Sequence, residues 1–204
     1  DLDKKGVLVF DNPFYLRDIN YSGVFGALVN VSDDYLEEAL KFVLETIKTI
    51  INLAPKNKEG GVFKIQDIFS LYYVDLFTIE LEDKRGYSDR EDIKNLFAVA
   101  TVLIKKTIGS REDKAKEMFN KYLKNLPENR AIWRLKLFAL SQNPEVFKEE
   151  LKQAMFRVFE IGERYFEIEG GAEYHQTLIK CFGIFEETTQ REYVDKIFEY
   201  FADE

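Results

Sequence analysis

Apolar residues recur every three or four positions along most of this chain, a pattern that predicts amphipathic α-helices. The clearest example is the segment 32–54, which opens on Ser32, a residue suited to capping a helix, and ends before Pro55. Its apolar positions share one side of a helix and comprise Leu36, Leu40, Val43, Ile47, Ile50 and Ala54. The next segment, 64–82, is apolar on nearly every side, which is typical of a central, buried helix.

The rest of the chain repeats this periodicity. It predicts helices over 88–108, 110–126, 129–141, 144–170, 172–186 and 189–201. The links within pairs are short, and short links place consecutive helices antiparallel. The helices that open pairs begin near residues 89, 130 and 172, about 41 residues apart, which lies within the range of HEAT and armadillo repeats. We therefore expect an all-α fold of antiparallel helix pairs, forming an α-solenoid-like array of the HEAT, armadillo or tetratricopeptide kind.

The first 31 residues lack this regularity, and we expect an irregular N-terminal segment of short helices and loops over 1–31. Within it, Val7 to Phe10 could form a short strand, and Asn12-Pro13 is typical of a helix start. Residues 32–204 are expected to form a single helical-repeat-like domain. The chain has no initiator Met, which is compatible with a fragment of a longer protein.

One junction resembles the tetratricopeptide family. Its residues are spaced like the second helix of such a repeat followed by the start of the next: Ala115, Phe119, Tyr122, Pro127 and Trp133. The resemblance covers about 25 residues and ends at Lys136 and Leu137, where that family has Leu and Gly. It implies helical-repeat packing at this junction. Trp133 also shares its helix with several apolar residues, so we expect it to be buried where two helix pairs meet.

Composition narrows the classes of function. The formal net charge is −8, which disfavours nucleic-acid binding because phosphate contacts require a basic face. A single cysteine, Cys181, excludes an intramolecular disulfide and favours a reducing, cytoplasmic location. There is no apolar run of the length that spans a membrane, and the charged first residues do not resemble a signal peptide.

The sequence contains no recognisable catalytic, cofactor-binding or metal-binding motif. His175 and Cys181 are six residues apart, which places them on different faces of a helix and argues against a nucleophilic pair. The acids at 33, 34, 37 and 38 resemble a magnesium-binding cluster, but they fall at a predicted helix N-terminus, where acids are favoured in any case. We predict no catalytic residues, no cofactor and no metal.

Asp75 is the most unusual residue, because it lies within the most apolar predicted helix. A buried carboxylate must be paired or neutralised. One interpretation is an aromatic ligand pocket formed by Tyr72, Tyr73, Asp75 and Phe77. The alternative is a structural hydrogen bond or an outward orientation.

A mostly cationic stripe is predicted on the helix 110–126, opposite Phe119 and Leu126. It comprises Lys114, Glu117, Lys121 and Lys124, at helical spacing. It is either a solvated face or a docking site for an acidic partner surface.

Together these patterns favour a protein–protein interaction or scaffolding module without catalytic activity of its own. The expected partner is another protein or another domain of the same parent chain, not nucleic acid or a membrane. Two alternatives stay open: a helical ligand-sensing domain around Asp75, and part of an enzyme whose catalytic residues lie on domains absent from this chain.

Overall fold

The computed structural model describes residues 21–54, 56, 75–81, 89–109, 112–161 and 171–202. Every regular element within these ranges is a helix, so the all-α prediction is confirmed there. The elements of the first half are α1 (Tyr21–Val29), the 3-10 turn η1 (Asp33–Tyr35), α2 (Leu36–Asn52) and α3 (Asp89–Ile104). The strand expected at Val7 to Phe10 and the helix start expected at Asn12 lie outside the described residues.

The second half carries the remaining elements. In chain order they are the π-helix η3 (Lys105–Gly109), α4 (Glu112–Met118), the π-helix η4 (Phe119–Leu123), α5 (Arg130–Leu140), α6 (Lys148–Phe156), α7 (Val158–Ile161), α8 (Ala172–Cys181), the 3-10 turn η6 (Phe182–Ile184) and α9 (Glu187–Ala202). The starts predicted near residues 89, 130 and 172 agree with the first residues of α3, α5 and α8.

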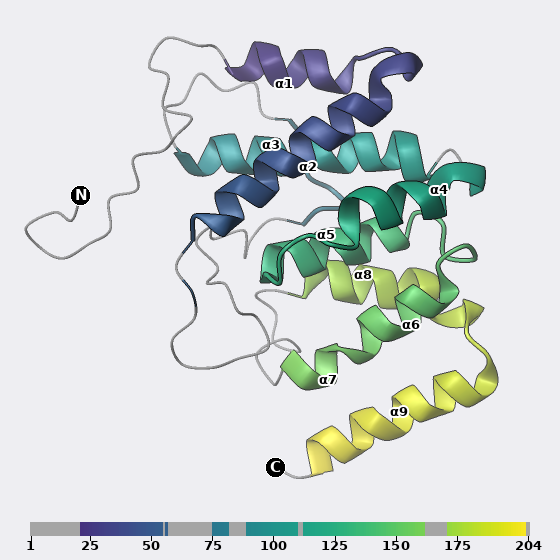
Figure 1. Cartoon of the computed structure of the whole chain (residues 1–204). Helices are drawn as coiled ribbons and strands as arrows, with labels where there is room; N and C mark the ends of the chain where they lie inside the picture. The colour runs from purple at the N-terminus through teal and green to yellow at the C-terminus, as the bar shows by residue number, and fades with distance from the viewer. Residues whose placement is uncertain are drawn as a thin grey trace, which may run out of the picture.

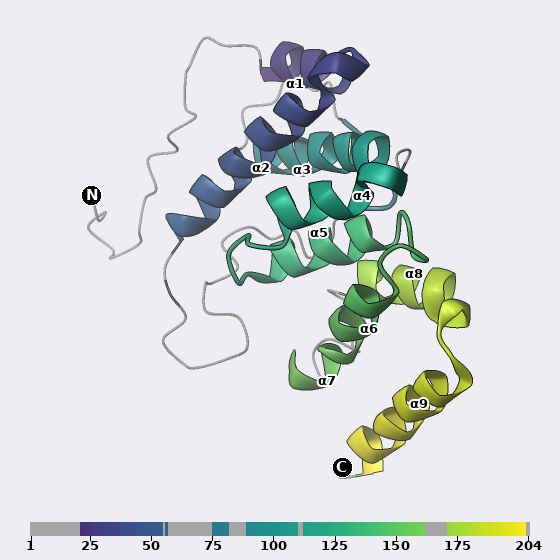
Figure 2. The same cartoon turned by 45° about the vertical axis from the view of Figure 1, so that its right-hand side comes forward.

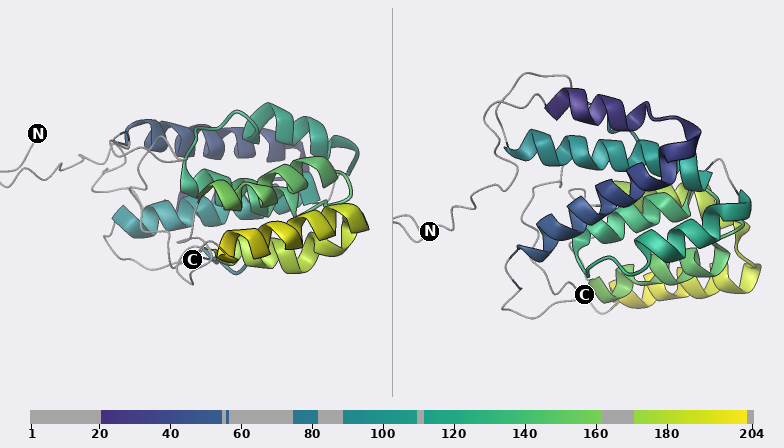
Figure 3. Two further views of the ribbon diagram at one scale, coloured as in Figure 1. Left: turned by 90° about the horizontal axis from the view of Figure 1, so that it is seen from below. Right: turned by 45° about the horizontal axis from the view of Figure 1, so that its top comes forward.

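The helices lie in two layers. Figure 1 shows α3, α5 and α8 one below another at the back, with α2, α4 and α6 in front of them. The order is the same after a turn of 45° (Figure 2), where α9 follows at the lower end. From below, α2 and α4 lie on one side and α3 and α8 on the other (Figure 3). Along the back layer α3 contacts α5 and α5 contacts α8, while α2 packs on α3.

One continuous hydrophobic core runs between the layers. The apolar stripe predicted for 32–54 faces this core: Leu36, Leu40, Val43, Ile47 and Ala54 are buried, and Ile50 is half-buried. The back layer is buried most thoroughly, because α5 has neighbours on several sides. Nine of its residues are buried: Ala131, Ile132, Trp133, Arg134, Leu135, Leu137, Phe138, Ala139 and Leu140.

Ion pairs join helices of the front layer to one another and to α9. They connect α2 with η4, α4 with α6, and α6 with α9, through Glu37–Lys121 at 2.7 Å, Lys116–Glu150 at 3.6 Å and Lys152–Glu192 at 3.3 Å. Exposed pairs of this kind add little stability. We infer that they orient neighbouring helices, while the core between the layers holds them together.

The helix predicted over 64–82 is wrong for its final part. Residues 75–81 form a turn followed by irregular chain, and 57–74 lie outside the described residues. The Asp75 carboxylate accepts a hydrogen bond from the Phe77 N–H at 2.8 Å, and the Leu76 N–H donates to Glu173. Short polar side chains that bond the nearby backbone compete with helix formation. The N–H groups of Phe77 and Leu76 therefore bond the side chains of Asp75 and Glu173 rather than the carbonyls of a helix.

The helix predicted over 144–170 also differs from the structure. Residues 144–147 are turns, α6 begins at Lys148, and a turn at Arg157 separates it from α7. Asn143 does not cap α6. Its side-chain amide donates to the carbonyl of Ile108 at the end of η3, where helix carbonyls lack partners within the helix.

The helices predicted over 88–108 and 110–126 both change from α-helical to π-helical hydrogen bonding near their ends, in η3 and η4. Lys136, where the tetratricopeptide resemblance ends, donates through Nζ to the carbonyl of Lys124, the residue that follows η4. Burial of Lys136 lowers its pKa. A polar side chain thus satisfies a helix end at the position where that family has an apolar residue.

The predicted burial of Trp133 is confirmed. Its side chain is 4% exposed and stacks on Tyr174 of α8, with ring centroids 6.3 Å apart and planes inclined by 22°. The contact joins α5 to α8, the opening helices of two successive pairs.

Trp133→Ala is expected to lower the free energy of unfolding by about 3–5 kcal/mol, because it removes a buried ring and leaves a cavity. Urea unfolding followed by circular dichroism measures this loss. Ile179→Ala on α8, whose side chain is 82% exposed, serves as the control and should cost less than about 0.5 kcal/mol. A loss below about 1 kcal/mol for Trp133→Ala would contradict the packing described above.

Candidate functional site

A buried ion pair lies at the centre of the back layer. Arg134 of α5 and Glu173 of α8 are 3% and 0% exposed. The guanidinium binds the carboxylate through two nitrogens, with Nε donating to Oε2 at 2.5 Å and Nη2 to Oε1 at 2.8 Å. The backbone N–H of Leu76 donates to the same Oε1 at 2.7 Å. Both carboxylate oxygens are therefore hydrogen-bonded.

Aromatic contacts surround this pair. Trp133 and Tyr174, the sequence neighbours of Arg134 and Glu173, stack beside it. The Phe77 ring packs edge-on against Phe138 of α5, with centroids 5.1 Å apart. These contacts dock residues 75–81 against α5 and α8. Because the carboxylate is buried and bonded on both oxygens, the cluster is built to hold the fold together rather than to bind a ligand.

The pocket predicted around Asp75 is described only in part. Tyr72 and Tyr73 lie outside the described residues. Asp75 is half-buried, and its carboxylate is used by its own turn, while the Phe77 ring is used by the contact with Phe138. The described members of this set therefore have structural roles.

The predicted cationic stripe is exposed along its length. Lys114, Glu117, Lys121 and Lys124 are all at the surface. Lys121 forms an ion pair with Glu37 of α2 at 2.7 Å, so its charge is partly neutralised within the protein. The stripe was predicted for a continuous α-helix, whereas Lys121 lies within the π-helix η4. A π-helix takes more residues per hydrogen-bonded turn, so Lys121 and Lys124 are rotated relative to the predicted line.

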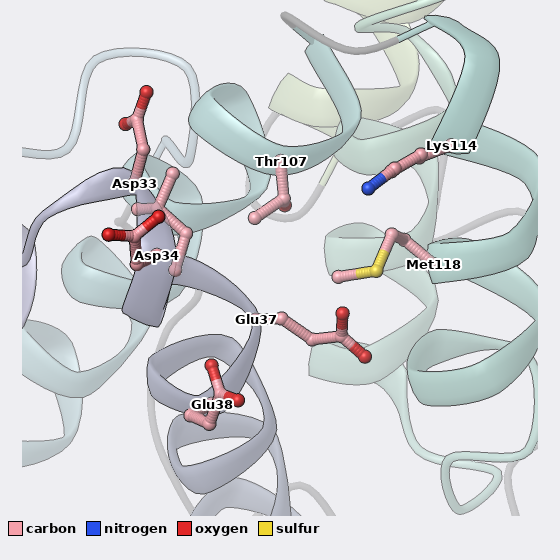
Figure 4. Close-up of a pocket in the computed structure, with 8 residues that line it drawn as sticks. Asp33, Asp34, Glu37, Glu38, Thr107, Lys114 and Met118 are labelled. Carbon is pink, nitrogen blue, oxygen red and sulfur yellow. The ribbon is translucent and has the colours of Figure 1, made fainter.

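A pocket of about 270 Å³ opens between the start of α2 and the helix α4 (Figure 4). It is lined by Asp33, Asp34, Leu36, Glu37, Glu38, Thr107, Lys114 and Met118. Glu37 projects from α2 toward the side of Lys114 and Met118, while the carboxylates of Asp33 and Asp34 point elsewhere. Within the described ranges no cluster of three or more acidic, His or Cys side chains could hold a metal ion.

Glu37 is the acid in this pocket with the clearest partners. Hydrogen bonds from Lys121 at 2.7 Å and from the Tyr122 hydroxyl at 2.6 Å lower the pKa of Glu37. The same bond to Glu37 raises the pKa of Lys121, and burial is the main cause of the raised pKa of Tyr122. This group of three connects the start of α2 to η4.

His175 and Cys181 both lie on α8 but in different environments. His175 is exposed, whereas Cys181 is fully buried, and burial raises the pKa of its thiol. A raised pKa disfavours the thiolate, which is the reactive form of cysteine.

The outward side of α2 exposes large apolar side chains, a feature that sequence reasoning missed. Phe42 is 57% exposed, and Leu53 follows eleven residues later, about three helical turns along the same side. Tyr35, at the start of the helix, is also exposed. The apolar positions that break the inward stripe of 32–54 were the available signal. We name Tyr35, Phe42 and Leu53 the α2 outer row.

A second set of exposed apolar side chains lies on α9. Val194, Phe198 and Phe201 follow one another at helical spacing. The helix carries four acids and two bases, and Arg191 pairs with Glu187 at 2.9 Å.

Glu173→Ala is expected to destabilise the protein by about 3–5 kcal/mol, because it leaves the Arg134 charge buried without its partner. Urea unfolding measures the loss, with Glu149→Ala on the exposed side of α6 as the control. The double variant Arg134→Leu/Glu173→Gln should lose less than the sum of its two single variants, because it removes the unpaired charge. Additive losses would contradict a coupled pair.

Glu37→Gln is expected to lower the melting temperature at about pH 7 and to have a diminishing effect in acid. The pKa of Glu37 is lowered from 4.5 in the folded state, so its stabilisation is present above 4.5 and is lost as pH falls through the folded-state pKa. Thermal melts of both proteins between about pH 7 and pH 3 test this. Glu38→Gln controls for the loss of one charge. A Glu37→Gln difference that stays constant across this range would refute the predicted linkage.

Among the helices in the described ranges, none combines the length and apolar character that crossing a membrane requires. The chain matches no protein-family model, no curated protein and no solved structure. The function is therefore inferred from the molecule's own surface and contacts.

Proposed function

We propose that this chain is a protein–protein interaction module whose helix pairs stack in the manner of an α-solenoid. Its partner is another protein, or another domain of the same parent chain, in the reducing cytoplasm. The proposal gives the chain a binding role without chemistry of its own. It excludes nucleic acid as the ligand, because the net charge of −8 opposes phosphate binding.

The arrangement of the layers supports the solenoid part of the proposal. The helices α3, α5 and α8 follow one another in the back layer, and ion pairs join α2 to η4, α4 to α6, and α6 to α9. Contacts between successive units are what distinguishes a helical-repeat stack from a closed bundle. Such stacks expose long curved surfaces, and partners bind there.

The observation that carries the proposal is the α2 outer row. Seven residues of α2 are buried in the core: Leu36, Ala39, Leu40, Val43, Leu44, Ile47 and Ile51. The opposite side nevertheless exposes Phe42, Leu53 and the adjacent Tyr35. Single exposed apolar residues are ordinary, but a row of apolar side chains along one helix, two of them aromatic, is typical of an interaction surface.

The cationic stripe predicted from the sequence is a weaker candidate for the same role. Lys121 is paired with Glu37, and the α2 outer row offers apolar area that the stripe lacks. Apolar and aromatic side chains supply most of the binding energy at protein interfaces, whereas rim charges mainly affect association rates. We therefore place the main docking surface on α2.

Site-specific photo-crosslinking in the cells of origin tests the proposal. A photoreactive phenylalanine analogue at position 42 should capture one discrete partner protein. The same analogue at Ile179 of α8, which is more exposed but lies away from α2, is the control and should not capture that partner. An identical crosslinking pattern at both positions, or no crosslinked protein at either, would be evidence against an interaction surface on α2.

A further inference from the structure

The helix α9, at the lower end of the stack in Figure 2, is anchored by one buried side chain. Of its sixteen residues only Tyr193 is buried, whereas α2, of similar length, buries seven. Ile197 and Tyr200, on the same side as Tyr193, are half-buried, and Phe198 on another side is 69% exposed. Undocking of α9 therefore exposes far less apolar area than unfolding of the core, so it can occur separately.

The ring of Tyr193 enters an aromatic site formed by three elements. It lies against Phe156 of α6, Phe159 of α7 and Phe182 of η6, with centroid distances of 5.3, 5.3 and 5.6 Å. We name these three rings the aromatic site. Each ring is only half-buried even with α9 in place. Undocking of α9 would expose them further, so α9 covers an apolar surface on the rest of the fold.

Lys152 of α6 lies at the edge of the aromatic site. Its ammonium is 5.5 Å from the centroid of the Phe156 ring. It also donates to Glu192 at 3.3 Å and to the Thr189 hydroxyl at 3.4 Å. Glu192 immediately precedes Tyr193, so the site accepts an aromatic anchor with an acid beside it. The Glu192 side chain is 51% exposed, and its ion pair orients α9 more than it stabilises the docked state.

Tyr193 is an imperfect anchor for this site. Its side chain is 2% exposed, and its hydroxyl has no hydrogen-bond partner among the described residues. Burial raises the pKa of this hydroxyl. A hydroxyl that loses its bonds to water and gains none in the protein destabilises the docked state. A Phe side chain at this position would fill the site without that cost.

These features favour one kind of competitor for the site. Two copies that exchanged α9 would make the same contacts at each site, and the two-residue link Phe185–Glu186 after η6 already keeps α9 near its own site. A helix with Phe at the position of Tyr193 would instead gain by lacking the unpaired hydroxyl. Glu149 and Glu160 are exposed on α6 and α7, so ring packing and the Lys152 contact, rather than a basic surface, select the occupant.

We infer that α9 is an autoinhibitory helix, which undocks as a unit and frees the aromatic site for a helix of the partner protein that carries a Phe anchor preceded by an acid. This inference rests on the proposed interaction function and adds a site that is separate from the α2 outer row. The aromatic site is blocked until the partner's helix displaces α9. The unpaired hydroxyl of Tyr193 makes this displacement easier.

The chain supplies its own probe, a fluorescent peptide of residues 186–202. Fluorescence anisotropy should show this peptide binding the full-length Tyr193→Ala chain, whose own α9 has lost its anchor, at least about tenfold more tightly than the unmodified chain. The peptide carrying Tyr193→Phe should bind the same Tyr193→Ala chain about tenfold more tightly than the unmodified peptide does. Circular dichroism verifies that the Tyr193→Ala chain is folded.

Matched peptide variants then locate the contacts. Tyr193→Ala in the peptide should weaken its binding to the Tyr193→Ala chain at least about tenfold, whereas Phe198→Ala removes an exposed ring and should change it less than about twofold. Glu192→Lys should weaken binding about fivefold at low salt, because it opposes Lys152. Glu199→Lys makes the same charge change about two turns further along and should have less than half this effect.

Hydrogen exchange tests the opening of α9 in the unmodified full chain. Its α9 amides should exchange at least about tenfold faster than the core amides of α5. Tyr193→Phe in the full chain should slow the α9 amides about tenfold, because it removes the unpaired hydroxyl. Saturation of the unmodified chain with the Tyr193→Phe peptide should accelerate the α9 amides to the rate of an undocked helix, since the peptide takes the place of α9.

Several results would overturn the inference. They are α9 amides that exchange as slowly as those of α5, equal peptide binding by the unmodified and Tyr193→Ala chains, and α9 amides that stay protected when the peptide is bound. Dimerisation in sedimentation velocity that Tyr193→Ala abolishes would assign the site to α9 of a second copy.

The two proposals can fail separately. A partner crosslinked at position 42, together with a failure of the peptide and exchange tests, would leave the interaction function intact and refute the autoinhibitory helix. Displacement of α9 by the peptide without any crosslinked protein at position 42 would support the autoinhibitory helix and refute the docking surface on α2.

Discussion

The buried ion pair between Arg134 and Glu173 is the interaction on which the back layer depends. Removing both charges from water costs several kcal/mol per ion, and this cost is offset only if the geometry is good and the remaining hydrogen-bonding groups are satisfied. Both conditions are met here, since the guanidinium binds through two nitrogens and the Leu76 N–H binds the carboxylate as well. A pair of this kind penalises any packing that separates its members. It therefore fixes how α5, α8 and residues 75–81 meet.

The two layers are stabilised in different ways, and the difference follows from this constraint. The back layer is stabilised by buried apolar contacts around one buried charge pair, including the stacked rings of Trp133 and Tyr174. The front layer packs on it through one side of each helix and is oriented by exposed ion pairs. The outward side of α2 is therefore not needed for stability. Within the described chain Tyr35, Phe42 and Leu53 lie outside the core, and we propose that a partner covers them.

The sequence predicted the elements better than their connections. The starts of α3, α5 and α8 and the burial of Trp133 followed from periodicity, because an amphipathic helix shows in local spacing whatever its neighbours are. The π-helices at the ends of α3 and α4 did not follow from periodicity, because they depend on contacts made across the fold. Asn143 illustrates this, since its side chain satisfies η3 rather than starting α6.

The sequence left three roles open for Asp75, and the structure gives it a structural hydrogen bond, to the Phe77 N–H of its own turn. Among the described residues, the fully buried acid is Glu173. Glu173 resembles any first-turn acid, so its own surroundings gave no signal. The surroundings of Arg134 did give a signal of burial, because this residue lies between Trp133 and Leu135 in an almost wholly apolar run. A buried cation predicts a buried acid, but the identity of that acid depends on the tertiary fold.

The most direct test of this account is the hydrogen-exchange rate of the Leu76 amide in the unmodified protein, measured by NMR. The structure gives this amide a buried acceptor, Glu173, 97 positions away in sequence, so its protection reports on the docked turn and the ion pair together. We predict that Leu76 exchanges as slowly as the core amides of α5. Exchange at the rate of an unprotected loop would show that the turn is not held by Glu173, and would contradict the account.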